Sequence, residues 1–187
     1  MKNKNIVLRH IRESDIADYE RWLTTETEWC DWDAPWEEDD PNEFLEMQKA
    51  YLKVTRGIYG KLEIDTIAGS HIGWVSSYRI DGNKEKIAVG INIPPVDVRG
   101  KGFGENALTL FMKYLFSARN NMKTLYTQTW SGNIAMIRLA EKIGFSVVER
   151  IEGIREVRGK NYDALTFSIS DKVFLSKYKD IRIKEKS

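Results

Sequence analysis

The sequence predicts an α/β (α+β) fold in which helices flank one mixed, mostly antiparallel central sheet. Segments with the two-residue period of strands alternate with segments that have the period of amphipathic helices. Three of the predicted strands follow one another directly between residues 61 and 93, which is typical of an antiparallel meander. We expect one domain over residues 1–170, followed by a basic C-terminal tail over residues 171–187.

The composition limits the class of protein. Hydrophobic residues make up 42% and charged residues 30% of the chain, which is ordinary for a soluble globular protein. The formal net charge of +1 argues against binding to nucleic acid. Cys30 is the single cysteine, and with only His10 and His71 beside it we expect neither an internal disulfide nor a metal site. The sequence has no long uncharged run, which favours a cytoplasmic protein that does not bind membranes.

The first predicted elements are a strand and two helices. We expect a strand over Ile6–His10, and then a helix with Ser14 as its N-cap and apolar residues repeating over residues 16–23. Pro41 has the position of the first residue of a second helix, which we expect to end near Gly57.

An acidic, tryptophan-rich stretch lies around the junction of these helices. Residues 22–48 contain ten carboxylates and no lysine or arginine. One interpretation is a partly buried loop, in which tryptophans cover the core and carboxylates face water. The other, which we prefer, is a cation-binding wall in which indole rings and carboxylates receive a protonated amine. The acceptor-binding residues are then Trp29, Asp31, Trp32, Asp33 and Trp36.

Three strands follow the second helix. They are expected over Lys61–Ala68, His71–Ile80 and Glu85–Ile93, with turns at residues 68–70 and 81–83. The third strand places aliphatic residues on one face and almost no side-chain bulk on the other. A bare face of this kind can receive an extended ligand beside the backbone.

A glycine loop comes next and leads into a helix. Gly100, Gly102 and Gly104 lie within five residues, and the helical pattern begins at Gly104. Glycine allows unusual backbone conformations and close approach of a ligand, and a helix N-terminus favours anions. The loop is therefore suited to hold phosphate. Apolar residues over 108–116 repeat with helical spacing, and we expect them in the core.

The C-terminal part adds a strand, a helix and a hairpin. These are expected over Lys123–Trp130 (strand), residues 134–143 (helix), and Phe145–Val157 with Asn161–Ser170 (hairpin). Gly144 is the expected end of the helix. In the tail, Phe174 and Leu175 are expected to dock on the body of the protein.

Two common phosphate-binding loops fit the glycines poorly. A mononucleotide P-loop needs Ser or Thr after Gly-Lys, and here Gly102 follows Lys101. Gly102, Gly104 and Ala107 match the dinucleotide pattern G-x-G-x-x-A, but residues 106–140 contain no acid to bind a ribose. The first loop is excluded and the second is disfavoured.

A family resemblance favours a third kind of phosphate loop. The segment Arg99–Gly104 resembles the R/Q-x-x-G-x-G/A signature of the GNAT superfamily of acyl-CoA N-acyltransferases. Residues 133–145 are similar to the pattern N-x-A-x-x-R-x-x-E-K-x-G-F of the GNAT branch that includes ribosomal-protein N-terminal acetyltransferases. The resemblance spans nearly the whole chain except the tail. It implies a splayed sheet, open between the strands that end at Ile93 and begin at Lys123.

The resemblance also implies a site for acetyl-CoA that needs no metal. In GNAT proteins the main chain of the glycine loop holds the pyrophosphate, and basic side chains add charge-assisted contacts. The pantetheine arm pairs with the bare strand edge, and a main-chain N–H near Ile93 polarises the thioester carbonyl. The cofactor-binding residues implied are Asn92, Ile93, Val98, Arg99, Gly100, Lys101, Gly102, Phe103, Gly104, Asn133 and Arg138.

Catalysis needs a base and a proton donor. A lysine-like amine has a pKa of about 10.4, so reaching its neutral form at pH 7 costs roughly 4.6 kcal/mol. The candidate bases are Glu28, Asp31 and Asp33. GNAT enzymes often protonate the leaving thiolate with a tyrosine, or with a serine in the N-terminal branch, at positions where this chain has Ala140 and Met136. Asn133 is a substitute donor, or it only caps its helix.

We therefore expect an enzyme that transfers the acetyl group of acetyl-CoA to a primary amine by direct attack on the thioester. The amine is expected to be a cationic small molecule or a peptide N-terminus. The missing tyrosine and serine keep open a second hypothesis, a regulatory module that binds acyl-CoA without turnover. A homodimer is compatible with either hypothesis.

Overall fold

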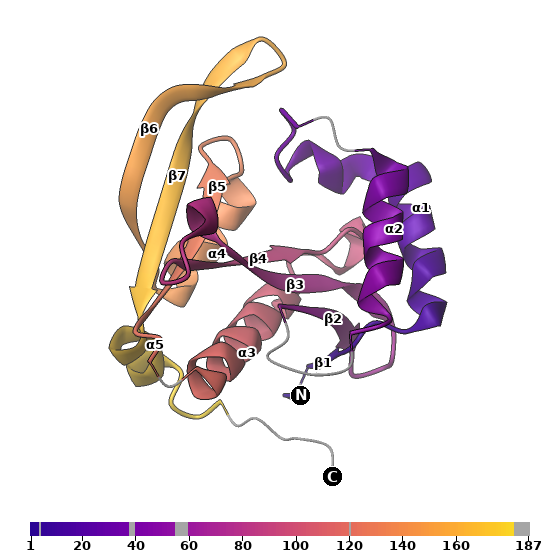
Figure 1. Cartoon of the computed structure of the whole chain (residues 1–187), viewed down its shortest axis with the longest axis horizontal. Coiled ribbons are helices and arrows are strands. Elements are labelled where there is room, and N and C mark those ends of the chain that lie inside the picture. Colours follow the sequence, from indigo (N-terminus) through magenta and orange to yellow (C-terminus); the bar gives the residue numbers. More distant parts are fainter. Residues whose placement is uncertain (4, 38–39, 55–59, 120, 182–187) are drawn as a thin grey trace.

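A seven-stranded sheet in the order β1-β2-β3-β4-β5-β7-β6 runs through the molecule (Figure 1). The computed structural model describes residues 1–3, 5–37, 40–54, 60–119 and 121–181. The strands are β1 (Ile6–Arg9), β2 (Lys61–Thr66), β3 (His71–Arg79), β4 (Ile87–Asn92), β5 (Thr124–Trp130), β6 (Ser146–Val157) and β7 (Lys160–Ser170). The α-helices are α1 (Ile16–Thr24), α2 (Pro41–Tyr51), α3 (Phe103–Ala118), α4 (Ile134–Ile143) and α5 (Asp171–Lys177). The predicted mixed, mostly antiparallel sheet is confirmed.

Alternating side chains divide the two faces of the sheet. Val75 and Val89 are fully buried in the main core, together with the apolar side of α3 that the sequence predicted. Trp74, the neighbour of Val75, points to the other face and packs against Tyr19 and Trp22 of α1. Helix α3 and the α1–α2 pair therefore cover opposite faces, because successive strand residues point in opposite directions.

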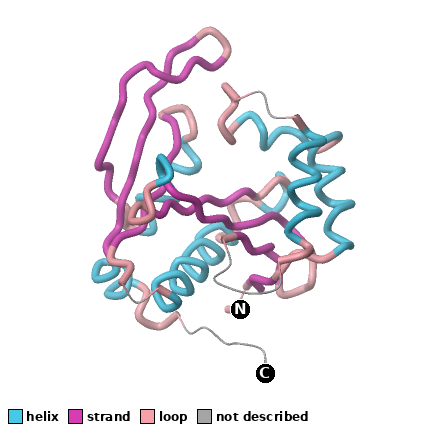
Figure 2. Tube along the Cα trace, viewed as in Figure 1, coloured by secondary structure: helices cyan, strands magenta, loops and turns pink. Residues whose placement is uncertain are grey.

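The sheet opens between β4 and β5. These parallel neighbours share the register pair Ala88 and Tyr126, and the Thr127 hydroxyl donates to the Val89 carbonyl at 2.8 Å. Further along, β4 pairs only with β3 and β5 pairs with β7, so the two strands diverge toward their carboxyl ends (Figure 2). The predicted splay is confirmed.

Strands β6 and β7 form a long hairpin that extends away from the rest of the sheet, at the upper left of Figure 1. β7 pairs with β5, so β6 is the outer strand. The register shifts between Ile151 and Arg155, where Gly153 has a φ of 63° and donates its N–H to Asp163. A bulge of this kind bends the strand, and Arg155 and Arg158 near the turn contact the acidic stretch.

The predicted start of the first helix is wrong. A 3-10 turn over Glu13–Asp15 precedes α1, and Asp15 rather than Ser14 has the N-cap position. The Asp15 carboxylate accepts the Arg12 N–H at 2.7 Å and pairs with Arg9 at 2.5 Å. These charged contacts hold the 3-10 turn that precedes α1.

The second helix begins as predicted and ends early. Pro41 is its first residue, and Asp40 caps it by accepting the Asn42 N–H at 2.8 Å. It ends at Tyr51. The predicted end, Gly57, lies outside the described residues, as do residues 38–39 of the acidic stretch.

The predicted tail starts with α5, which the Ser170 side chain caps. Phe174 is fully buried and its ring centroid lies 5.5 Å from that of Phe116, so its predicted docking is confirmed. Leu175 is 38% exposed, so it is less fully covered than Phe174. Residues 182–187 lie outside the described part of the chain. Within the described residues, the helices are too short or too polar to cross a membrane.

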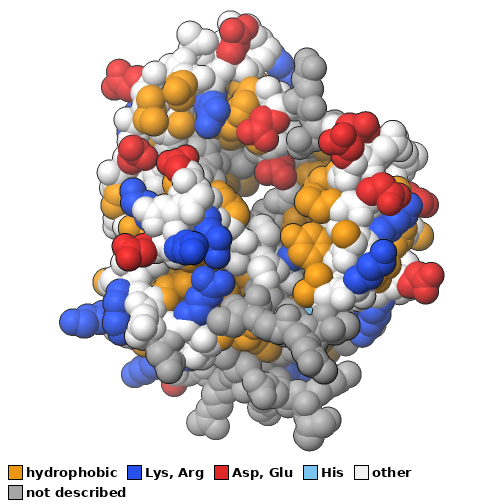
Figure 3. Space-filling model, in the orientation of Figure 1, with side chains coloured by type: hydrophobic (Ala, Val, Ile, Leu, Met, Phe, Trp, Pro, Cys, Tyr) orange, Lys and Arg blue, Asp and Glu red, His pale blue; other side chains and the backbone are white. Residues whose placement is uncertain are grey.

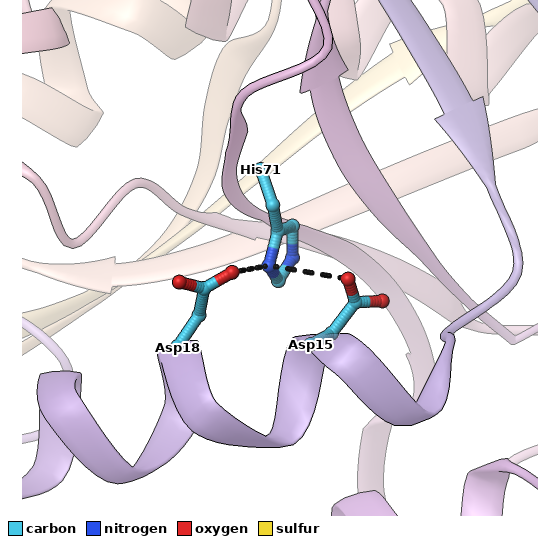
Figure 4. A group of neighbouring side chains, drawn as sticks. All are labelled: Asp15, Asp18 and His71. Atoms are coloured by element: carbon cyan, nitrogen blue, oxygen red, sulfur yellow. Dashed lines mark hydrogen bonds and ion pairs between the residues drawn. The ribbon is translucent and has the colours of Figure 1, made fainter.

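A buried cluster of charges joins α1 to the sheet. Through Nδ1, the His71 ring lies 2.9 Å from Asp18 and 3.7 Å from Asp15 (Figure 4). Through Nε2, it lies 3.0 Å from Glu63. Burial alone would lower the pKa of His71, but hydrogen bonds to Glu63 and Asp18 raise it above its ordinary value. Asp15 is also paired with Arg9. Because cations of the chain already partner these carboxylates, we interpret the cluster as structural rather than metal-binding.

Candidate active site

A cleft of about 1220 Å³ opens where β4 and β5 diverge. Figure 3 shows a hollow between the hairpin and the α1–α2 side, with acidic side chains around its rim. The predicted site residues that line the cleft are Glu28, Trp29, Trp32, Asp33, Trp36, Asn92, Ile93, Val98, Arg99, Gly100, Gly102, Phe103, Gly104 and Asn133. Three other predicted site residues, Asp31, Lys101 and Arg138, are described but do not line it.

The glycine loop lines one end of the cleft. Gly100 and Gly102 have φ angles of 74° and 82°, a region that residues with side chains rarely adopt. Gly102 is the N-cap of α3, and the bonding of the helix begins with the Asn106 N–H, 3.2 Å from the Gly102 carbonyl. The N–H groups before Asn106 have no acceptor within the helix, and the helix dipole favours an anion there. The end of the cleft is therefore built to receive phosphate.

The Arg99 side chain makes three contacts within the protein. Its Nε donates to the Ile93 carbonyl at 2.7 Å, its Nη2 donates to the Pro94 carbonyl at 2.6 Å, and its Nη1 pairs with Glu28. These contacts hold the guanidinium within the protein, so fewer of its five N–H donors remain for a phosphate. An anion at this end of the cleft would therefore meet chiefly main-chain N–H groups.

The acidic, tryptophan-rich stretch lines the opposite end of the cleft. Trp29 fits the interpretation as a loop that covers the core, and Trp32 fits the interpretation as a wall for a ligand. Trp29 is 7% exposed and donates its indole N–H to the Trp22 carbonyl at 2.9 Å, so it covers the core. Trp32 is 42% exposed and lines the cleft, as a wall for a ligand requires.

Cations of the hairpin engage other residues of this predicted wall. The Arg155 guanidinium lies 4.5 Å from the ring centroid of Trp36, within the range of a cation–π contact. Asp31 pairs with Arg158 and is not among the residues that line the cleft. The chain thus supplies its own cations to Trp36 and Asp31, and their role in binding the amine stays a prediction.

The two candidate bases in the cleft are both hydrogen-bonded. Glu28 accepts the Trp32 indole N–H at 2.7 Å and pairs with Arg99. The hydrogen bond from Trp32, followed by that from Arg99, holds the pKa of Glu28 below its ordinary value. Asp33 accepts the Asn92 amide at 2.5 Å. A lowered pKa makes Glu28 a weaker base than a free carboxylate.

Asn133 caps its helix. Its Oδ1 accepts the Met136 N–H at 3.0 Å, and its Nδ2 donates to the Trp32 carbonyl at 3.1 Å. Ala140 is fully buried and Met136 lines the cleft, so neither position offers a hydroxyl. Of the two alternatives for Asn133, the structure contains the helix cap. Both polar atoms of its side chain make hydrogen bonds within the protein, so the amide is a poor candidate for the proton donor.

Tyr78 is a cleft residue that the sequence analysis missed. It lies opposite Ala88 in the register of β3 and β4, on the same face as Gly90 and Asn92. Burial, and then the charge of Asp33, raise the pKa of Tyr78 to about 12, so its hydroxyl stays protonated at neutral pH. Pairing the strands across the predicted turn at residues 81–83 would have placed it on the bare face.

A polar chain on the hairpin side was also missed. The Gln128 amide donates to the Thr166 hydroxyl at 3.4 Å, and that hydroxyl donates to Glu149 at 3.3 Å. All three residues line the cleft. They come from three strands and lie up to 38 residues apart, so no local pattern marks them. Further cleft residues that were not predicted as site residues include Trp74, Trp130, Lys142 and Arg155.

A mixed sheet splayed at its parallel pair, with a glycine loop and a helix N-terminus at the opening, defines the class of acyl-CoA acyltransferase expected from the sequence. The family model described as an acetyltransferase (GNAT) domain matches residues 5–146, and the chain belongs to this family. The finer resemblance to ribosomal-protein N-terminal acetyltransferases stays a prediction.

Solved structures with the same fold include several acetyltransferases. Spermidine N-acetyltransferase from Vibrio cholerae, in complex with CoA and spermine, has a TM-score of 0.72 and 18% identity, over 92% of this chain and 99% of that chain. A GNAT-family acetyltransferase from Bacillus anthracis has a TM-score of 0.73 and 13% identity, over 92% and 98%. The protein yncA from Salmonella typhimurium, solved with its cofactor acetyl-CoA, has a TM-score of 0.65 and 19% identity, over 88% and 93%. Comparison with curated proteins found no match.

Proposed function

We propose that this protein transfers an acetyl group from acetyl-CoA to the primary amine of a cationic small molecule. The observation that carries the proposal is that one cleft holds both an anion-binding helix end and an acidic, aromatic wall. The first suits the pyrophosphate of a coenzyme, and the second suits an ammonium group.

The glycine loop fits coenzyme A. Gly100 and Gly102 keep side chains away from the main chain where phosphate would approach, and a Cβ built on Gly100 would meet open space. The bare edge of β4 ends at Asn92 beside the opening of the sheet. When bound, the acetyl thioester would supply the activated acyl group. The main chain of residues 98–104 would hold its phosphates, and residues 92–93 would orient its arm.

The charge of the cleft favours a cationic acceptor. Among the described residues that line it, Glu28, Asp33, Glu37, Asp81, Glu105 and Glu149 are acidic, and Arg99, Lys142 and Arg155 are basic. Glu105 and Lys142 form an ion pair at 2.7 Å, as do Glu28 and Arg99. The excess of carboxylates lies toward the wall and the hairpin, where an ammonium would gain most.

Proton transfer can use groups on both sides of the cleft. Asp33 lies on the wall side, and Glu149 ends the polar chain through Thr166 on the hairpin side. Either carboxylate can accept the amine proton directly or through water. Tyr78 holds a proton at its hydroxyl at neutral pH and is the best placed donor in the cleft that we identify.

Acetyl transfer can be tested by mixing the protein with acetyl-CoA and a panel of amines while following free thiol. Polyamines, aminoglycosides and peptide N-termini form the panel, because they differ in charge and reach. We expect turnover with an amine that carries several positive charges. Little turnover is expected with the N-terminus of a peptide that has no basic side chains. No turnover with any of them would contradict the proposal.

The absence of a hydroxyl at Met136 and Ala140 favours a second candidate, a module that binds acyl-CoA without turnover. Calorimetry of acetyl-CoA binding, read together with the amine panel, separates the two. Tight acetyl-CoA binding with no turnover of any amine would support the module, and no binding would exclude both candidates.

A further inference from the structure

The segment that carries Glu28, Trp32 and Asp33 is fastened to both edges of the opened sheet. On the β4 side, Arg99 pairs with Glu28, and the Asn92 amide donates to Asp33. On the β5 side, the Trp32 carbonyl accepts two hydrogen bonds, from the Trp130 indole and the Asn133 amide, each at 3.1 Å. We call residues 28–33 the bridge, because they connect the two strands that the splay separates.

Arg99 connects the bridge to the end of β4, beside the proposed acetyl-CoA site. It holds the carbonyls of Ile93 and Pro94, directly after the bare edge of β4, and holds Glu28 with the same guanidinium. Its planar fork fixes these groups relative to one another. Glu28 in turn holds Trp32 in place, because its carboxylate accepts a hydrogen bond from the Trp32 indole N–H at 2.7 Å.

We propose that Arg99 and Glu28 are positioning residues for acetyl transfer, whose ion pair sets the place of the acceptor wall relative to the donor end of the cleft. The inference rests on the proposed function. It gives both residues roles other than those expected from the sequence, in which Arg99 contacts phosphate and Glu28 is the base. It also explains why the two are paired although they lie 71 residues apart.

Their positions within the cleft support this role. The Arg99 side chain is 29% exposed and that of Glu28 is 47% exposed, so the pair contributes little to stability by itself. Its effect is on geometry, because a displacement of reacting groups by about 1 Å can lower a rate by roughly two orders of magnitude.

The test is a double-mutant cycle with Glu28→Gln, Arg99→Gln and both together, in the full-length protein. For each variant, kcat and KM for the amine, the acetyl-CoA dissociation constant and the pH profile of kcat are measured. We expect each single variant to lower kcat roughly tenfold and the double variant to lower it little further, because both remove the same connection. Acetyl-CoA affinity should change less than about twofold, and Arg99→Lys should recover part of the rate.

Matched controls and a structural readout complete the design. Glu26→Gln removes an acid of the same stretch that pairs with Arg21 outside the cleft, and should leave kcat unchanged. Amide hydrogen exchange of the bridge should rise equally in both single variants, which measures the connection without turnover.

Each alternative gives a different result. An increase in the acetyl-CoA dissociation constant as the main effect of Arg99→Gln would make Arg99 a phosphate ligand instead. Loss of the acidic limb of the pH profile in Glu28→Gln would make Glu28 the base. Losses that multiply to roughly a hundredfold would show that the residues act independently. Absence of turnover in the unmodified protein would reject the proposed function. Turnover in the unmodified protein, together with single-variant losses that are absent or independent of one another, would reject only the positioning role.

Discussion

The φ angle of 82° at Gly102 provides a test of the anion site at a single residue. In Gly102→Ala, the added Cβ disfavours this conformation by about 1–2 kcal/mol. We expect the loop to relax away from it, which turns main-chain N–H groups out of place and weakens acetyl-CoA binding roughly five- to thirtyfold. Titration calorimetry measures the change.

The matched control is Gly69→Ala. Gly69 has a φ of 94° in the turn between β2 and β3, and an added Cβ would meet nothing within 4 Å. The same backbone strain should lower the melting temperature there but leave acetyl-CoA affinity unchanged. Equal affinity losses in both variants would mean that the Gly102 effect is global destabilisation.

Tyr78 provides a second test at residue scale. Tyr78→Phe removes the protonated hydroxyl from the cleft and keeps the ring, so packing should change little. If this hydroxyl donates the proton during transfer, kcat should fall roughly a hundredfold with little change in KM.

The control for Tyr78 is Tyr162→Phe. Tyr162 packs against Trp130 with ring centroids 4.8 Å apart, but does not line the cleft. Its substitution should leave kcat unchanged. A kcat of unmodified size in Tyr78→Phe would show that another group supplies the proton.

At the scale of elements, the sequence predicts most of what depends on local pattern. The strands and the helix predicted over residues 61–116 correspond to β2, β3, β4 and α3, because turn residues separate the strands and the apolar residues of α3 repeat with helical spacing. The glycine loop could also be predicted from the sequence, because three closely spaced glycines before an amphipathic helix are typical of a phosphate-binding loop.

Contacts between distant residues account for what the sequence missed. Ser14 lies within the 3-10 turn that precedes α1, where the Asp15 carboxylate pairs with Arg9 of the preceding strand. Arg99 is tied to Glu28 across 71 residues, and Arg155 covers Trp36 across the cleft. Charge and composition showed that these side chains were available, but only the fold determines which of them meet.

The His71 cluster, which fastens α1 to the sheet, should make stability depend on pH. The folded pKa of His71 is raised above its ordinary 6.5, so the protonated ring stabilises the fold fully below pH 6.5. This contribution is lost as pH rises through the folded pKa. The groups that face the ring are Asp15, Asp18 and Glu63, and Lys61 lies behind Glu63 at 3.0 Å.

Denaturant unfolding at pH values from 6 upward measures this dependence. We expect the free energy of unfolding to fall with rising pH in the unmodified protein, and His71→Gln to remove most of that slope. His10→Gln is the control, because the pKa of His10 is lowered, chiefly by burial, and its contribution has the opposite sign. An unchanged slope in His71→Gln would place the titrating group elsewhere.

At the scale of the whole molecule, the central question is how two halves of a sheet hold together around an opening. β1 to β4 form one half and β5 to β7 the other, joined by the Ala88–Tyr126 pair, the Thr127 hydrogen bond and the core around α3. The bridge crosses the opening on one face. A ligand that lies between β4 and β5 would add contacts to both halves at once.

Acetyl-CoA should therefore stabilise the molecule as a single unit. At about one hundred times its dissociation constant, a ligand that binds only the folded state adds about 2.7 kcal/mol, which corresponds to roughly 5–10 °C in melting temperature for a chain of this size. Adenosine 3′,5′-bisphosphate, compared at a matched concentration, carries phosphates but no pantetheine arm. It should give a much smaller shift, since it lacks both the second phosphate of the pyrophosphate and the arm that would lie between the strands. Equal shifts with both ligands would mean that binding is confined to phosphate-bearing groups, and no shift with acetyl-CoA would contradict the cofactor site altogether.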